Sequence, residues 1–136
     1  MNVVIMGCGR TGAAIAASLD RDGHSVTVLD LNSGQFRRLP DAFGGRMAVG
    51  NGMDAEVLER AGAREADAFV AVTQGDNRNY FASQLAREIF GVQNVVCRTK
   101  DPERGEIFGH LGLQTYSPTS AGAEAILAML PGSGPA

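Results

Sequence analysis

The chain has 136 residues, 44% of them hydrophobic, which is enough for one compact domain and too few for two. Its formal net charge is −3 and no basic stripe runs along it, so nucleic acid is excluded as an expected partner. No apolar run approaches the roughly 20 residues that cross a bilayer. The two cysteines, Cys8 and Cys97, belong to no CxxC pair, which indicates a reduced, cytoplasmic protein.

Short apolar strands alternate with helical segments along the whole chain. Apolar runs predict strands at residues 3–6, 25–29, 47–49, 68–72, 94–97 and 114–116. Helical spacing and stop signals predict helices at residues 11–21, 35–39, 55–61, 77–90, from 102 onward, and 118–130. Asp54, Asp101 and Ser117 are the predicted N-caps of three of these helices.

This alternation predicts right-handed βαβ units and therefore an α/β fold. We expect a Rossmann-like, doubly wound parallel sheet of six strands with helices on both faces. A single domain is predicted over residues 1–130, and the Pro-Gly-Ser-Gly composition of residues 131–136 predicts a flexible tail.

The first predicted strand runs directly into Gly7-Cys8-Gly9-Arg10-Thr11-Gly12, which is a GxGxxG pattern. The pattern is weak alone in a chain with 18 glycines, but here it follows a strand and opens a helix. Gly7 permits the turn, Gly9 lets backbone approach phosphates, and Gly12 lets the helix pack on the strand. We predict that these six residues hold a pyrophosphate or phosphate at the helix start; the alternative is an ordinary strand-to-helix turn.

An acidic residue ends the second predicted strand, as the same fold requires. Asp30 lies 18 positions after Gly12, close to the usual spacing of about 20. Its carboxylate can accept hydrogen bonds from both ribose hydroxyls and would repel a 2′-phosphate. NAD or an adenine nucleotide is therefore expected in preference to NADP, with Leu31 beside the same ligand.

Other candidates follow the remaining strands, whose carboxyl ends line the ligand crevice of such a sheet. Arg10 is predicted to reach a phosphate, and Arg98 to bind one bidentately; a solvated position is the alternative for Arg10. For Lys100 the alternative is a surface charge. The remaining candidates at this edge are Asn51, Gly52, Thr73, Gln74 and Asn79.

Two of these assignments have plain structural alternatives. Asn51 either touches the adenine side of the ligand or forms a simple Asn-Gly turn. The neighbouring Asp76 is predicted to cap the helix that follows it rather than to bind ligand.

No catalytic residue and no metal site are predicted. The sequence contains no HExxH pattern, no metal-ligand spacing and no Tyr-x-x-x-Lys pair, which argues against a short-chain reductase. Cys8 lies where a helix dipole can lower a thiol pKa, but a small structural residue is the preferred interpretation, and Cys97 is interpreted as core. Binding without catalysis is preferred over the alternative, an NAD-dependent oxidoreductase fragment that lacks its substrate domain.

The residues also resemble a known family. VVIMGCGRTG, VTVLDLN, GNGMDAEVLERAGAREADAFVAVTQGDNRN, VVCRTKDPE and GLQTYSPTSAGAEAI together resemble the N-terminal nucleotide-binding domain of Trk-type potassium-uptake regulators, the RCK or KTN domains. The resemblance spans residues 1–129. It assigns Gly7, Gly9, Arg10 and Gly12 to the phosphate loop, Asp30 to the ribose, and Arg98 and Asn79 to the ligand site.

The resemblance also implies a function. It implies binding of NAD or NADH, or of ATP, ADP or AMP, by a regulatory subunit that gates an integral-membrane potassium transporter or channel from the cytoplasm. It implies a homodimer or a larger ring, with the last predicted helix, residues 118–130, crossing to a partner subunit. Asn51 and residues 74–77 depart from the family pattern, which leaves the contacts to the base and any bound cation open.

Overall fold

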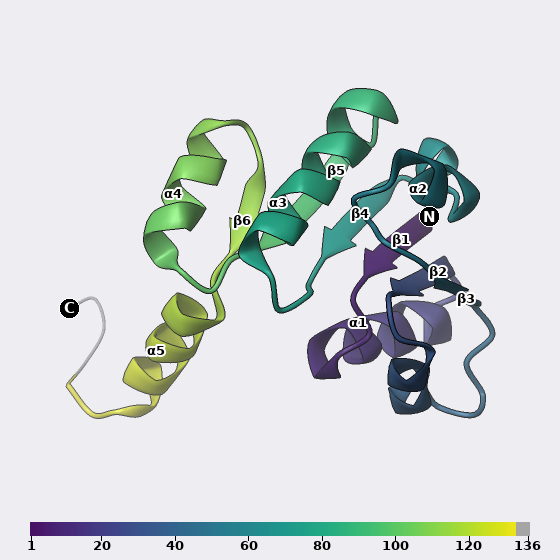
Figure 1. Cartoon of the computed structure of the whole chain (residues 1–136). Helices are drawn as coiled ribbons and strands as arrows, with labels where there is room; N and C mark the ends of the chain where they lie inside the picture. The colour runs from purple at the N-terminus through teal and green to yellow at the C-terminus, as the bar shows by residue number, and fades with distance from the viewer. Residues whose placement is uncertain (133–136) are drawn as a thin grey trace.

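Six parallel strands form the centre of the molecule, and the computed structural model describes residues 1–132 (Figure 1). The spatial order is β3-β2-β1-β4-β5-β6, which is the doubly wound order, so the predicted α/β fold is confirmed. Residues 133–136, part of the predicted tail, lie outside the described residues. The strands are β1 Asn2–Met6, β2 Ser25–Asp30, β3 Arg46–Val49, β4 Ala68–Ala71, β5 Asn94–Arg98 and β6 Gln114–Tyr116.

The helices begin and end close to the predicted positions. Side chains of Asp54, Asp101 and Ser117 accept hydrogen bonds from backbone N–H groups in the first turns of α2, α4 and α5, which confirms all three N-caps. The helices are α1 Arg10–Arg21, α2 Ala55–Arg60, α3 Asp76–Gln84, α4 Pro102–His110 and α5 Pro118–Met129.

Three short helical segments differ from the expectation. The helix predicted at 35–39 is a 3₁₀ helix, η1 Ser33–Arg38, which begins where the Asn32 side chain accepts from Gly34 N–H. The helix predicted over 77–90 continues beyond α3 as a π-helical turn, η3 Leu85–Ile89. A further 3₁₀ turn, η2 Ala63–Glu65, is too short to show a periodic pattern and was not predicted.

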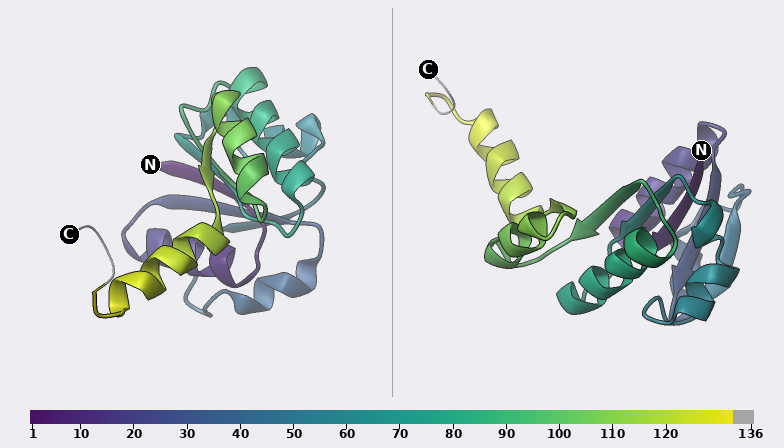
Figure 2. Two further views of the ribbon diagram at one scale, coloured as in Figure 1. Left: turned by 90° about the vertical axis from the view of Figure 1, so that its left-hand side faces the viewer. Right: turned by 90° about the horizontal axis from the view of Figure 1, so that it is seen from above.

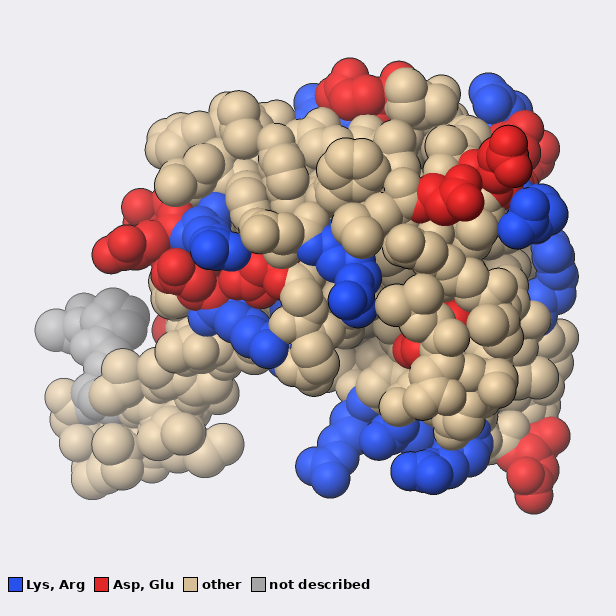
Figure 3. Space-filling view, in the orientation of Figure 1, with Lys and Arg blue, Asp and Glu red and all other residues tan. Residues whose placement is uncertain are grey.

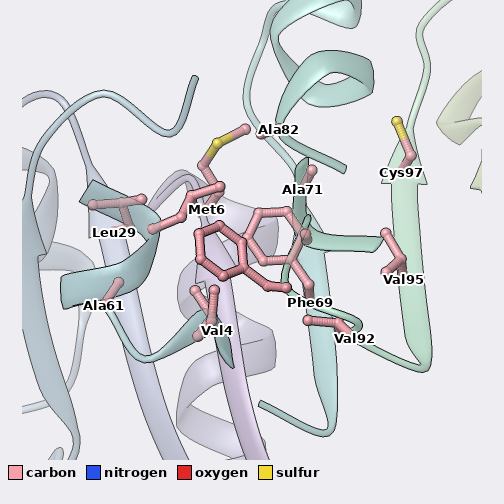
Figure 4. Packing of buried hydrophobic residues seen from close by; sticks show 14 of the residues in the cluster. Val4, Met6, Leu29, Ala61, Phe69, Ala71, Ala82, Val92, Val95 and Cys97 are labelled. Atoms are coloured by element: carbon pink, nitrogen blue, oxygen red, sulfur yellow. The ribbon is translucent and has the colours of Figure 1, made fainter. Parts of the chain in front are cut away.

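The two faces of the sheet bury separate apolar clusters. Alternate residues of β1 point to opposite faces, so Val3 and Ile5 pack under α1 while Val4 and Met6 pack under α2 and α3. Phe69 of β4 is completely buried at the centre of the second cluster (Figure 4). Burial on both faces explains why the central strands are continuous apolar runs.

The strand order fixes where a ligand can bind. β2 and β4 pair with β1 on opposite sides. From β1 the chain adds β2 and β3 toward one edge of the sheet, and from β4 it adds β5 and β6 toward the other edge. The crevice at such a switch point lies at the carboxyl ends of the strands, which is also where α1 and α3 begin.

The last helix stands apart from this body. α5 contains no buried residue in the described part of the chain and projects away from the sheet (Figures 1 and 2). Ile126 is 62% exposed and Met129 is 81% exposed. Globular proteins seldom leave the side chains of an apolar helix exposed to solvent.

Candidate functional site

A cavity of about 610 Å³ opens at the carboxyl edge of the sheet, at the switch point between β1 and β4. This volume lies within the range of about 300–1,000 Å³ that is usual for small-molecule sites. Most predicted site residues line it: Gly7, Gly9, Arg10, Thr11, Asp30, Leu31, Gly52, Thr73, Gln74 and Arg98. The sequence positions brought together here span β1, β2, β4 and β5 and the loops that follow them.

Gly7 directly follows β1 and turns the chain toward α1. Its φ of +109° lies in the region that side-chain-bearing residues avoid. A Cβ atom at this position would also lie 3.0 Å from the backbone of Val72 and Thr73. Glycine is therefore required twice at this turn, for its backbone angle and for its closeness to the end of β4.

Gly9 and Gly12 have opposite surroundings. A Cβ atom at Gly9 would meet nothing within 4 Å, whereas one at Gly12 would lie 1.8 Å from the Gly7 carbonyl oxygen. Gly9 is the N-cap of α1 and no side chain caps this helix. The backbone N–H groups of the first turn are thus left for an anion, while Gly12 lets α1 pack directly on the loop.

Asp30 ends β2 and lines the same cavity. Its Oδ2 accepts a hydrogen bond from Cys8 N–H at 2.8 Å, and its Oδ1 accepts from Asn32 N–H at 2.9 Å. A carboxylate oxygen has two lone pairs, so each oxygen keeps one for a further donor. The two hydroxyls of a ribose are donors of the matching kind.

Asn79 is completely buried and does not line the cavity. Its side chain bonds to the backbone N–H and carbonyl of Thr73, to the Thr73 hydroxyl and to the Arg98 carbonyl. Asn79, a predicted ligand contact, instead lies behind Thr73 and Arg98, both of which line the cavity.

The cavity is strongly basic. Arg10, Arg38, Arg78 and Arg98 line it, and Asp30 is the one carboxylate among its lining residues in the described chain. Basic side chains lie on both sides of the hollow on this face (Figure 3). A protein with a net charge of −3 therefore concentrates positive charge at one crevice, which favours an anionic ligand.

One end of the cavity is less charged. Leu31, half exposed, lines it together with Gly50 and Gly52. A Cβ atom at Gly52 would lie 2.0 Å from the Met6 sulfur, so the Met6 side chain would have to shift to admit any larger residue. The Asn51 side chain accepts from Met53 N–H and does not line the cavity. Of the two alternatives for Asn51, this arrangement matches the simple turn rather than the contact to adenine.

The prediction that Asp76 caps α3 is wrong. The N-cap is Gly75, and the Asp76 carboxylate instead accepts from Lys100 N–H at 2.8 Å and Asp101 N–H at 3.4 Å. Its side chain faces the β5–α4 loop, because the sheet brings that loop beside the start of α3. Lys100 does not line the cavity.

Both cysteines are buried, and neither forms a disulfide within the described residues. Burial, followed by the nearby Asp30 carboxylate, raises the pKa of the Cys8 thiol, while Arg38 lowers it. This rise in the Cys8 pKa is opposite in direction to the shift that a helix dipole would produce. Burial likewise raises the pKa of Cys97 to about 11, in agreement with its predicted core position.

Sequence reasoning missed three polar residues of the cavity: Gln35, Arg38 and Arg78. Gln35 and Arg38 belong to η1, directly after the Asp30 strand, and Arg78 lies in the first turn of α3. All three lie in the helical segments that follow β2 and β4, where no local pattern distinguishes a cavity residue from an exposed one. The predicted residues Cys8, in the glycine loop, and Gly12, in the first turn of α1, do not line the cavity.

No helix within residues 1–132 is long and apolar enough to span a membrane. No group of three or more His, Cys, Asp or Glu side chains in that range is placed to hold a metal ion.

The chain is similar to known proteins over nearly its whole length. It is 47% identical over 134 residues to the Trk system potassium uptake protein TrkA of Streptomyces coelicolor, covering 98% of this chain and 60% of that protein. The chain therefore spans somewhat more than half of that relative's length.

Solved structures share the fold. The TrkA-N domain of the inner membrane protein ybaL from Escherichia coli superposes with a TM-score of 0.85 at 17% identity, covering 95% of this chain and 96% of that one. GsuK bound to ADP gives 0.77 at 25% identity over 92% of this chain and 32% of GsuK. The GsuK channel bound to NAD gives 0.70 at 23%, over 86% and 21%.

The family assignment rests on the sequence profile that matches this chain. The TrkA-N domain profile covers residues 3–117, from the first strand through the N-cap of α5. This range contains the glycine loop, Asp30 and every other residue that lines the cavity. The chain belongs to the TrkA-N domain family.

Proposed function

We propose that this chain is a regulatory module of a potassium uptake system or channel and that it binds NAD, NADH or an adenine nucleotide such as ATP, ADP or AMP. One observation supports the proposal most directly: the start of α1, which no side chain caps, and the Asp30 carboxylate both line the same basic cavity. An anion and a ribose are the groups that these two features suit.

The cavity suggests one orientation of the ligand. Phosphates lie against the N–H groups that follow Gly9, with Arg10 and Arg98 as counter-charges. The ribose lies on Asp30, and the base lies toward Leu31 and Gly52. Thr73 and Gln74, which follow β4, bound the cavity beside the phosphates. In a dinucleotide the second nucleoside extends toward these two residues.

The relatives support the ligand and the setting. The Streptomyces relative is named as a Trk system potassium uptake protein, and GsuK structures are described as bound to ADP and to NAD. We propose that ligand exchange changes the assembly of these domains and thereby gates an integral-membrane potassium transporter or channel. The module would act in the cytoplasm, held at the inner face of the membrane by that partner.

A homodimer or a larger ring is the proposed assembly, with α5 as a contact. Its exposed Ile126 and Met129 form an apolar surface that a second subunit would bury. Exchange of α5 between two copies would also explain why it lies away from its own sheet (Figure 2).

A ligand panel tests the proposal. Purified protein is titrated by calorimetry with NAD, NADH, ATP, ADP, AMP and, as a base control, GTP. We expect saturable binding of at least one adenine ligand, a higher unfolding temperature in its presence and no binding by an Arg10→Ala, Asp30→Ala double variant that stays folded. Absence of adenine binding at millimolar concentration would refute the proposal, and substrate-dependent oxidation of NADH would favour the oxidoreductase alternative.

A further inference from the structure

We infer that Asn79 is a positioning residue of the nucleotide site, which holds the ends of β4 and β5 so that Thr73 and Arg98 face the phosphates. The inference rests on the proposed function. It assigns Asn79 a role without ligand contact, whereas the sequence pattern alone suggested a direct one.

Asn79 lies at the point where the ladder between the two strands stops. Paired residues of β4 and β5 run from Ala68 with Asn94 to Ala71 with Cys97. Thr73 and Arg98 lie beyond the last pair. The Asn79 Nδ2 donates to the Thr73 carbonyl at 3.0 Å and to the Arg98 carbonyl at 3.1 Å, and so joins the two chains there.

The other end of the amide binds the same loop. Asn79 Oδ1 accepts from Thr73 N–H at 3.0 Å and from the Thr73 hydroxyl at 2.6 Å. A primary amide has two donor hydrogens and two acceptor lone pairs, and all four are used. Since the side chain is also completely buried, it has no group left to offer a ligand.

The residues that Asn79 holds are those nearest the proposed phosphates. Thr73 and Arg98 both line the cavity, and an Arg98 guanidinium nitrogen lies 3.5 Å from the Thr73 carbonyl. Release of the amide would let the two strand ends separate and would move the guanidinium away from the loop of Gly7. Asp30 and Leu31 lie on the other half of the sheet, which has its own hydrogen bonds.

This division predicts a selective defect. Asn79→Asp keeps both acceptors and loses both donors, so the link to the two carbonyls is broken while the volume of the side chain is unchanged. Ser83→Ala is the matched control, because Ser83 is equally buried on the same face of α3, one turn away from the cavity edge. Each variant is titrated with ADP and with adenosine, which lacks the phosphates, by ¹⁵N NMR of the full chain.

We expect Asn79→Asp to weaken ADP binding by roughly tenfold or more, the effect of losing one or two hydrogen bonds, and to change adenosine binding by less than about twofold. Ser83→Ala should leave the ratio of the two affinities at its wild-type value. A wild-type ratio of ADP to adenosine affinity in Asn79→Asp overturns the inference. This holds whether both affinities are unchanged or both fall by the same factor, as a purely structural role would produce.

The wild-type protein provides a test that needs no variant. Thr73 N–H should exchange slowly with solvent and should become slower on addition of ADP but not of adenosine. Rapid exchange that ADP leaves unchanged overturns the inference even if Asn79→Asp does not fold. Failure of the wild-type chain to bind ADP, NAD or any other adenine ligand refutes the proposed function itself, and this inference with it.

Discussion

The Asp30 carboxylate is hydrogen-bonded to the glycine loop, because its Oδ2 accepts from Cys8 N–H at 2.8 Å. The residue that the proposed ribose would contact therefore also fixes the loop that would contact the phosphates. Asn32 N–H, 2.9 Å from Oδ1, holds the carboxylate from the other side. The acid is thus oriented before a ligand arrives, which lowers the entropy cost of binding.

Replacement of Asp30 by Asn should weaken binding of NAD and ADP by about 10- to 100-fold, since hydrogen bonds to charged groups contribute roughly 1.5–3 kcal/mol. The amide must also turn a donor toward either Cys8 N–H or Asn32 N–H, so the unfolding temperature should fall. Calorimetry and thermal denaturation measure both effects. Asp41→Asn, a change at an exposed carboxylate outside the cavity lining, is the control.

The same substitution should alter cofactor choice. The wild-type chain is expected to bind NAD more tightly than NADP, because Asp30 repels a 2′-phosphate. Asp30→Asn should narrow this preference, since Arg38 in the same cavity can then pair with the phosphate. Equal affinities of the wild-type chain for NAD and NADP would show that the carboxylate does not face the ribose.

Two glycine substitutions should separate binding from stability. Gly9→Ala places a methyl group in open space, so the protein should fold normally and bind nucleotide more weakly, because the methyl group occupies the phosphate path. Gly12→Ala forces a methyl group against the Gly7 carbonyl and should lower the free energy of unfolding by about 1–3 kcal/mol. Urea denaturation and ADP titration distinguish the two effects, and full affinity in Gly9→Ala would count against a phosphate beside this residue.

The Cys97 thiol should make stability depend on alkaline pH. Its pKa rises from an ordinary 9.0 to about 11 in the folded protein, so folding favours the protonated form. This contribution, about 3 kcal/mol at most, is complete below pH 9 and is lost as the pH rises from about 9 to 11. Denaturation at pH 8 and pH 10.5 should show a smaller pH-dependent loss in Cys97→Ala than in the wild-type protein; equal losses would contradict the assignment.

The assembly of the protein should depend on α5. Ile126→Asp with Met129→Asp places charges on its exposed surface and should convert a dimer or larger ring into monomers, as measured by sedimentation velocity. Glu124→Gln, a polar change on the same helix, is the control. A wild-type chain that sediments as a monomer at high concentration would contradict the proposed contact.

Much of this protein was determined locally by its sequence. Residues 3–6 are apolar without interruption because β1 is buried on both faces, and such a run can be read without knowing the neighbours. The glycine spacing, the acid at position 30 and the caps of α2, α4 and α5 are likewise fixed by backbone geometry within a few residues. These features were sufficient to predict the fold and one half of the cavity.

The rest depended on distances between segments remote in sequence. Asp76 looked like a helix cap, yet its partners are the N–H groups of Lys100 and Asp101, which only the pairing of β4 with β5 brings within reach. Asn79 is buried rather than facing the cavity, and its amide donates to the carbonyl of Arg98, a residue 19 positions away in the sequence. Strand order and close packing decide such neighbours, and no local pattern contains them.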